Sequence, residues 1–146
     1  MAIKLQLVRD NHVICEFPLS TDDWRRGDLE NEIDSMQREL ENFSKVMDAL
    51  ANVNRVRMVA QLLADDDYTL NFKDFIDDLG LNPKLVREHA KRLCDAGFLD
   101  TPERGKYRLS PLGRVRFLAA GPAMRRILRE LVDQSNDAMD SDYSVE

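Results

Sequence analysis

The amino-acid sequence predicts a mainly helical α+β fold with two small β-hairpins. Three observations predict it: alternating apolar residues near the amino terminus, apolar residues at helical spacing through most of the chain, and a second short alternating segment after residue 97. The chain has 146 residues, of which 43 % are hydrophobic and 33 % charged. This size and composition are typical of one ordinary domain with an appendage, and no apolar run is long enough to span a membrane.

The first 43 residues combine a hairpin with the start of a long helix. Residues 3–8 and 13–17 alternate apolar and polar side chains, and residues 9–12 supply the turn between them. From Leu29 to Leu50, apolar residues recur at alternating steps of four and three, which is a heptad pattern. This pattern predicts either a helix that pairs with a second copy of the chain or one that packs along its own domain. Because its polar face is mainly acidic, a parallel pairing with itself is disfavoured.

The middle of the chain predicts two helices that meet near Asn52, followed by a short strand and a third helix. Helical periodicity in residues 46–64 is interrupted near Asn52, so two helices meet there. A short strand at residues 68–70 precedes a helix over 72–79, which Asn71 caps and Gly80 ends. Asp65, Asp66 and Asp67 are adjacent in the sequence, and we interpret them as a solvated loop without chemistry.

The helix over 72–79 and the next helix form a helix-turn-helix unit, joined by a tight turn. Asn82 is the N-cap of the second helix, Pro83 its first residue and Gly97 its stop. Helical spacing directs three apolar side chains inward and places four polar ones on the opposite side. The inward residues are Val86, Ala90 and Leu93, and the outward residues are Lys84, Arg87, Glu88 and Lys91. A helix that presents cations from its first two turns has the geometry that enters the major groove of DNA.

A second hairpin and a broken helix complete the pattern. Residues 98–101 and 107–110 are predicted strands, and the turn between them, with the start of the second strand, carries Arg104, Lys106 and Arg108. A hairpin placed after a helix-turn-helix unit predicts a winged helix-turn-helix domain, whose wing contacts the DNA backbone or minor groove. A helix then starts at Ser110-Pro111, breaks at Gly121-Pro122 and resumes to residue 131.

Charge is distributed unevenly along the chain. The net charge of −6 taken as a whole argues against a polyanionic partner. Residues 1–80 carry 9 basic and 17 acidic side chains (net −8), residues 81–116 carry 9 and 4 (net +5), and residues 117–146 carry 3 and 6 (net −3). The basic segment is compatible with a nucleic-acid footprint and equally with a solvated helix face.

Three stretches of the sequence resemble ArsR-type winged-helix transcription regulators, particularly their archaeal relatives. These are LANVNRVRMV, LGLNPKLVREHAKRLCDAGFL and YRLSPLGR, and the resemblance covers roughly residues 44–118. It implies a homodimer that binds double-stranded DNA through the second helix and the wing. The residues it implies as DNA contacts are Lys84, Arg87, Glu88, Lys91, Arg104, Lys106 and Arg108; the part of Arg92 stays ambiguous. Residues 72–79 lack the cysteine pair of metal-sensing members and residues 111–131 lack histidine, so we expect no metal and no cofactor.

These observations together predict four segments and a function. Residues 1–43 are expected to serve assembly, 44–118 to bind DNA and 119–131 to dimerise, with 132–146 an acidic disordered tail. We expect a cytoplasmic, homodimeric, sequence-specific regulator of transcription that is neither membrane-bound nor an enzyme, because no catalytic motif occurs. A small-molecule effector stays an open question. The alternative function is that of a protein–protein adapter in a larger assembly.

Three single residues have two interpretations each. His89 is either packed near the helix–helix interface, which we favour, or a DNA contact. Trp24 is favoured as a packing anchor over a stacking platform for nucleic acid. Cys94 is favoured as a small boundary residue over a redox sensor.

Overall fold

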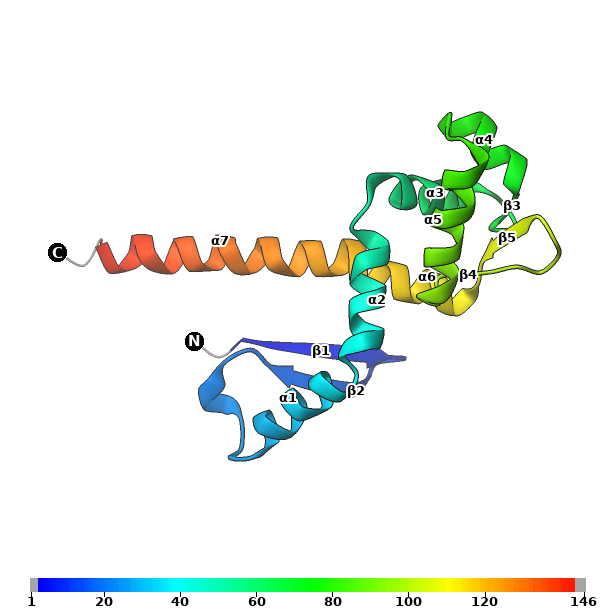
Figure 1. Ribbon diagram of the computed structural model, residues 1–146. Helices are drawn as coiled ribbons and strands as arrows, with labels where there is room; N and C mark the ends of the chain where they lie inside the picture. Colours follow the sequence, from blue (N-terminus) through cyan, green and yellow to red (C-terminus); the bar gives the residue numbers. More distant parts are fainter. Residues whose placement is uncertain (1–2, 144–146) are drawn as a thin grey trace. The chain divides into compact units, whose positions relative to one another are not determined.

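Helices and two small antiparallel sheets make up the computed structural model, which describes residues 3–143 and the side chains of residues 3–135 (Figure 1). The mainly helical α+β class predicted from the sequence is confirmed. The chain divides into two compact units, Met1–Glu41 and Asn42–Glu146. We call them the N-terminal unit and the C-terminal unit.

The N-terminal unit begins with the predicted hairpin. Strands β1 (Lys4–Arg9) and β2 (His12–Pro18) pair antiparallel, with Leu5 opposite Phe17 and Leu7 opposite Cys15. The register shifts between Leu7 and Val8, which sets Val13 opposite Val8. This β-bulge interrupts the regular alternation that was predicted for residues 13–17.

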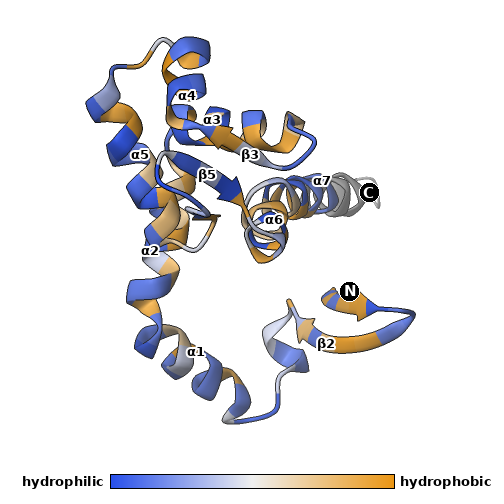
Figure 2. Ribbon diagram, turned by 90° about the vertical axis from the view of Figure 1, so that its right-hand side faces the viewer, coloured by the Kyte–Doolittle hydropathy of each residue, from blue (hydrophilic) through white to orange (hydrophobic). Residues whose placement is uncertain are grey.

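A short 3₁₀ turn, η1 (Thr21–Asp23), leads from the hairpin to helix α1 (Asp28–Arg38). Trp24 packs at this connection: its ring lies edge-on to Phe17 at 4.9 Å between centroids, and its Nε1 donates to the carbonyl of Pro18 at 3.1 Å. The interpretation of Trp24 as a packing anchor is therefore confirmed. In residues 3–41 no side chain is fully buried, and the apolar residues of the hairpin, coloured orange in Figure 2, are exposed.

The heptad segment forms two helices, and the prediction of one continuous helix over 29–50 is wrong. Helix α1 ends at Arg38, Glu39 leaves helical geometry at φ −99° and ψ 8°, and helix α2 (Leu40–Leu50) follows. The physical reason is packing. Toward its end α2 buries Ala49 in the core of the C-terminal unit, whereas Ile33 and Met36 of α1 are exposed. A heptad pattern predicts a continuous apolar face. It does not show that the residues of this face belong to two helices in different units.

The C-terminal unit contains the predicted helix-turn-helix and wing. Helix α3 (Val53–Ala64) starts at Asn52, whose side chain accepts from the backbone N–H groups of Asn54 and Arg55. Strands β3 (Thr69–Asn71), β5 and β4 form a three-stranded sheet in that order. The remaining elements of this part are α4 (Phe72–Leu79), α5 (Pro83–Asp95), β4 (Leu99–Asp100) and β5 (Lys106–Leu109).

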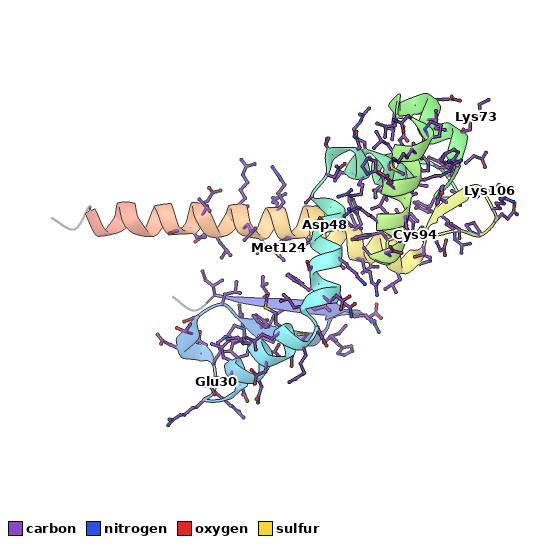
Figure 3. All side chains as sticks on the ribbon, viewed as in Figure 1. Glu30, Asp48, Lys73, Cys94, Lys106 and Met124 are labelled. Atoms are coloured by element: carbon purple, nitrogen blue, oxygen red, sulfur yellow. The ribbon has the colours of Figure 1, made fainter. Side chains whose placement is uncertain are left out.

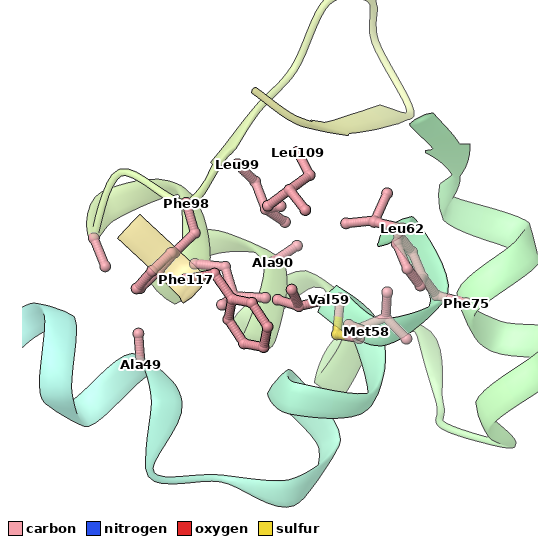
Figure 4. Packing of buried hydrophobic residues seen from close by; sticks show 13 residues of the cluster. Ala49, Met58, Val59, Leu62, Phe75, Ala90, Phe98, Leu99, Leu109 and Phe117 are labelled. Carbon is pink, nitrogen blue, oxygen red and sulfur yellow. The ribbon is translucent and has the colours of Figure 1, made fainter. Parts of the chain in front are cut away.

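One apolar core holds these elements together (Figure 4). Helices α3, α4 and α5 and the sheet each contribute fully buried side chains, so the helices are fixed against the strands from which the wing projects. The fully buried large residues are Phe75, Phe98, Met58, Leu62, Leu93, Leu109, Val59 and Val86.

A long helical segment follows the wing. Helix α6 (Pro111–Leu118) starts at Ser110, whose Oγ accepts from the N–H of Gly113 at 2.9 Å. A π-helical turn, η2 (Ala119–Ala123), contains Pro122 and joins α6 to α7 (Met124–Tyr143). The sequence predicts a disordered tail from residue 132, and the structure describes α7 as far as Tyr143. An existing helix can be extended without a new nucleation step, which composition alone does not reveal. The end of the predicted tail, residues 144–146, lies outside the described residues.

Candidate nucleic-acid interface

The caps at the two ends of α5 and the buried side of this helix determine which of its side chains are exposed. At the start of α5, Asn82 Oδ1 accepts from the N–H of Leu85 at 2.9 Å. After the helix ends at Asp95, Gly97 adopts the left-handed conformation at φ +82° and turns the chain away from the helix axis. Val86, Ala90 and Leu93 have no exposed surface, as their spacing predicts. The four side chains predicted to contact DNA, Lys84, Arg87, Glu88 and Lys91, are all exposed.

Phe72 joins this helix to the wing. Its ring faces the guanidinium of Arg87, with Cζ 5.0 Å from the ring centroid, and its backbone N–H donates to the carbonyl of Gly105 in the wing loop at 2.8 Å. Arg87 is also near enough to Tyr107 of β5 to oppose the rise in the tyrosine pKa that burial causes. The exposed Arg87 side chain of α5 therefore stacks on α4 and lies near β5. The sequence carried no signal for this contact, because each partner is an ordinary residue of a separate element.

The wing cations are paired with acids. Across the β4–β5 pair, Arg108 donates from Nε and Nη2 to both carboxylate oxygens of Asp100, at 3.0 and 2.8 Å. Nζ of Lys106 lies 3.5 Å from Oε2 of Glu103, and Figure 3 places Lys106 at the wing. Arg104 is exposed in the loop between the strands. We predicted these three cations as DNA contacts, and two of them already have acidic neighbours.

Lys91 and Arg92 of α5 are paired as well. Nζ of Lys91 lies 2.9 Å from Oδ2 of Asp95 one turn later, and Nη1 of Arg92 lies 2.7 Å from Oδ2 of Asp48 on α2. The ambiguous Arg92 thus ties α5 to α2. A shallow polar cavity of about 550 Å³ lies along this contact. Its lining combines three acidic and three basic residues: Lys45, Asp48, Glu88, Lys91, Arg92 and Asp95.

Behind the exposed face lies a buried polar pair that the sequence interpretation missed. Arg55 of α3 is 7 % exposed and His89 of α5 is 8 % exposed, and Arg55 Nη1 lies 3.3 Å from His89 Nδ1. The packed interpretation of His89 is confirmed by this burial. A signal for Arg55 existed: it stands three and four residues before Met58 and Val59, so a cation falls within the apolar stripe of α3.

Two further groups have little chemistry. Burial, with Asp95 and Asp100 nearby, raises the pKa of the Cys94 thiol, which disfavours the thiolate that a redox sensor uses. In the acidic loop, Asp65 Oδ2 accepts from the N–H groups of Asp67 and Thr69.

Among the described side chains, no three His, Cys, Asp or Glu residues are grouped to hold a metal ion. No helix within residues 3–143 is long and apolar enough to cross a bilayer.

Comparison with known proteins identifies structural neighbours of low similarity. No protein-family model matches the chain, and no curated protein matches it. Sco5413, a MarR family transcriptional regulator from Streptomyces coelicolor, is similar in structure with a TM-score of 0.45 and 17 % identity, over 78 % of this chain and 97 % of that one. RV1404 from Mycobacterium tuberculosis is similar with a TM-score of 0.43 and 16 % identity, over 75 % and 82 %. Similarity at this level does not assign a function to the chain.

Proposed function

We propose that this protein is a cytoplasmic, sequence-specific DNA-binding regulator of transcription. In this proposal α5 enters the major groove with Lys84, Arg87, Glu88 and Lys91, and the wing contacts backbone or minor groove with Arg104, Lys106 and Arg108. The resemblance of residues 44–118 to ArsR-type regulators supports the same assignment. No metal or cofactor is part of it.

The observation that carries the proposal is the position of Arg87. Its guanidinium is exposed on the outer face of a helix-turn-helix second helix and is stacked on Phe72, whose backbone is bonded to the wing loop. An arginine in such a position can donate two parallel hydrogen bonds to the O6 and N7 acceptors of guanine. The recognition residue and the wing are thereby aligned by one residue, Phe72, through its ring and its backbone.

We further propose that the protein binds DNA as a homodimer. Helices α6 and α7 expose a series of large apolar side chains, which a monomer in water would leave uncovered. These are Leu112, Val115, Leu118, Met124, Leu128 and Val132. A symmetric dimer would present two α5 helices to half-sites about one helical turn apart.

The proposal is tested by selecting bound sequences from a random double-stranded DNA library, with the wild type and the Arg87→Ala variant. The wild type should enrich a palindromic motif, and Arg87→Ala should lose about 1–3 kcal/mol of preference at one guanine of each half-site. Arg38→Ala, which removes an exposed arginine of α1, is the matched control and should retain the motif. Enrichment of the same motif by Arg87→Ala would exclude Arg87 from base reading.

The adapter function is the second candidate, and the exposed apolar residues of the N-terminal unit favour it. A DNA-cellulose column at moderate salt separates the two. Retention of the protein supports DNA binding, whereas complete flow-through together with a stoichiometric protein partner supports the adapter.

A further inference from the structure

Arg55 closes the carboxyl end of α2 with its side chain. Nε donates to the carbonyl of Ala49 at 2.8 Å, and Nη2 donates to the carbonyl of Asp48 at 2.9 Å. The last carbonyls of a helix have no partners within the helix, and they carry the negative end of its dipole. A buried guanidinium is therefore well placed there, and it fastens α3 to α2.

The third contact of Arg55 reaches α5 and defines the protonation state of His89. A guanidinium can only donate hydrogen bonds, so the Nδ1 of His89 that lies 3.3 Å from Nη1 must be the accepting, unprotonated nitrogen. His89 is then a neutral imidazole with its proton on Nε2. Burial and, after it, the charge of Arg55 lower the pKa of His89; Glu88 opposes this shift and Arg92 adds to it.

The charged groups around His89 come from three helices. Arg55 faces it from α3, Glu88 and Arg92 flank it on α5, and Asp48 of α2 neutralises Arg92. The Arg55–His89 contact and the Arg92–Asp48 ion pair thus hold the middle of α5 against the end of α2. Because Glu88 directly precedes His89 in the chain, any displacement of His89 moves the exposed face of α5.

We propose that the Arg55–His89 pair positions α5 for DNA binding and that protonation of His89 releases this helix. The inference rests on the proposed function for its DNA readout. A proton on Nδ1 would point at an N–H of Arg55 and place two cations 3.3 Å apart in a buried position. The hydrogen bond would then be lost, and the exposed Arg92–Asp48 pair would be the one polar contact described here that still joins α5 to the end of α2, beside the apolar packing.

The direction of the pH effect follows from the lowered pKa. The contact contributes its full stability above the ordinary pKa of histidine, about 6.5, and loses it as the pH falls through the lower value in the folded protein. DNA affinity should decrease about tenfold for each pH unit below that value, because one proton must leave before binding. General electrostatics predicts the opposite, since added protons make a protein more attractive to phosphates.

Two measurements test the pair, and the first needs no DNA. The NMR titration of the full-length protein should give His89 a pKa below the ordinary histidine value of about 6.5. A His89 pKa at or above that ordinary value would overturn the inference, even if the protein binds DNA. A correct low value without any DNA binding would instead contradict the proposed function.

The second measurement is DNA affinity between pH 8 and 5 for three proteins. His89→Asn retains an acceptor close to the position of Nδ1 and does not titrate, so its affinity should stay level or rise in acid. His12→Asn is the control and should follow the decrease of the wild type. If His89→Asn decreases as the wild type does, the inference is wrong. If His89→Asn does not fold, the wild-type affinity decides, because an affinity that stays level or rises in acid would overturn the inference.

Discussion

Acidic neighbours of the interface cations are the main departure, at the residue scale, from what the sequence predicted. Lys106, Arg108 and Lys91 were predicted as DNA contacts, and they lie beside Glu103, Asp100 and Asp95. Exposed ion pairs contribute about 0–1 kcal/mol, so a phosphate can displace the acid. Replacing the acidic partner of a cation by a phosphate costs the energy of the ion pair. A sum of charges along the chain does not include this cost.

The Glu103–Lys106 pair gives a prediction in two directions. Glu103→Gln should raise affinity for DNA of any sequence by about two- to fivefold, because Lys106 no longer has an acidic competitor for phosphate. Lys106→Ala should weaken binding to all sequences and reduce the slope of log affinity against log salt by about one. Fluorescence anisotropy titrations over a range of salt concentrations measure both.

Glu32→Gln is the matched control for Glu103→Gln, since it removes the same charge from α1, outside the proposed interface. It should leave DNA affinity nearly unchanged. An equal increase in the two variants would show that only the net charge of the protein matters, and the wing would lose its proposed contact.

At the scale of elements, the ends of helices could be predicted well and their lengths could not. Asn82 and Ser110 cap the helices they were expected to cap, because a cap is a local interaction between residues two or three positions apart. Asn52, near which two helices were expected to meet, caps α3. The break at Glu39 and the continuation of α7 to Tyr143 depend on what each helix packs against or extends. A short stretch of sequence does not show what its helix packs against, because the packing partners lie elsewhere in the chain.

Two glycines of the segment after the wing should respond to alanine in opposite ways. A Cβ at Gly113 in α6 would lie 2.0 Å from the carbonyl oxygen of Phe98, so Gly113→Ala should destabilise the fold by about 1–3 kcal/mol through overpacking. The gain in helix propensity, about 1 kcal/mol, is too small to reverse this. Thermal unfolding followed by circular dichroism measures the change.

Gly121→Ala is the paired variant in the π-helical turn. Its Cβ would meet Phe117 at 3.8 Å and Leu50 at 4.0 Å, which are ordinary van der Waals distances. The variant should therefore unfold at or above the wild-type temperature. Equal destabilisation of Gly113→Ala and Gly121→Ala would contradict the close approach of α6 to Phe98.

For the molecule as a whole, the sequence predicted the order of its elements and left out the contacts that join them. Arg55 and His89 are 34 residues apart, and Phe72 reaches both α5 and the wing loop. Contacts of this kind form only after distant segments meet. The winged arrangement could be predicted because each of its elements has its own periodicity and its own turn residues.

The exposed apolar residues of α7 predict the behaviour of the whole protein in solution. Leu128 is 56 % exposed, so Leu128→Asp removes little packing within one chain. It should nevertheless convert a dimer to a monomer, because a carboxylate would be buried at the interface. Light scattering after size-exclusion chromatography gives the mass directly.

Arg126→Asp is the control for this change. It introduces the same side chain two residues away, on the opposite side of α7, since successive residues are about 100° apart. It should leave the dimer intact. A dimeric mass for Leu128→Asp would move the proposed interface away from this face of α7.

The acids of the wing also bear on how such a protein would find its site. At physiological salt, electrostatic attraction fades over about 8 Å, and Glu103 and Asp100 weaken it further at the surface. The protein would then slide only short distances along DNA and search mainly by repeated release and rebinding through solution. In the same titrations the Glu103→Gln protein should bind random DNA more tightly, which implies that it stays longer on such DNA and scans further before each release.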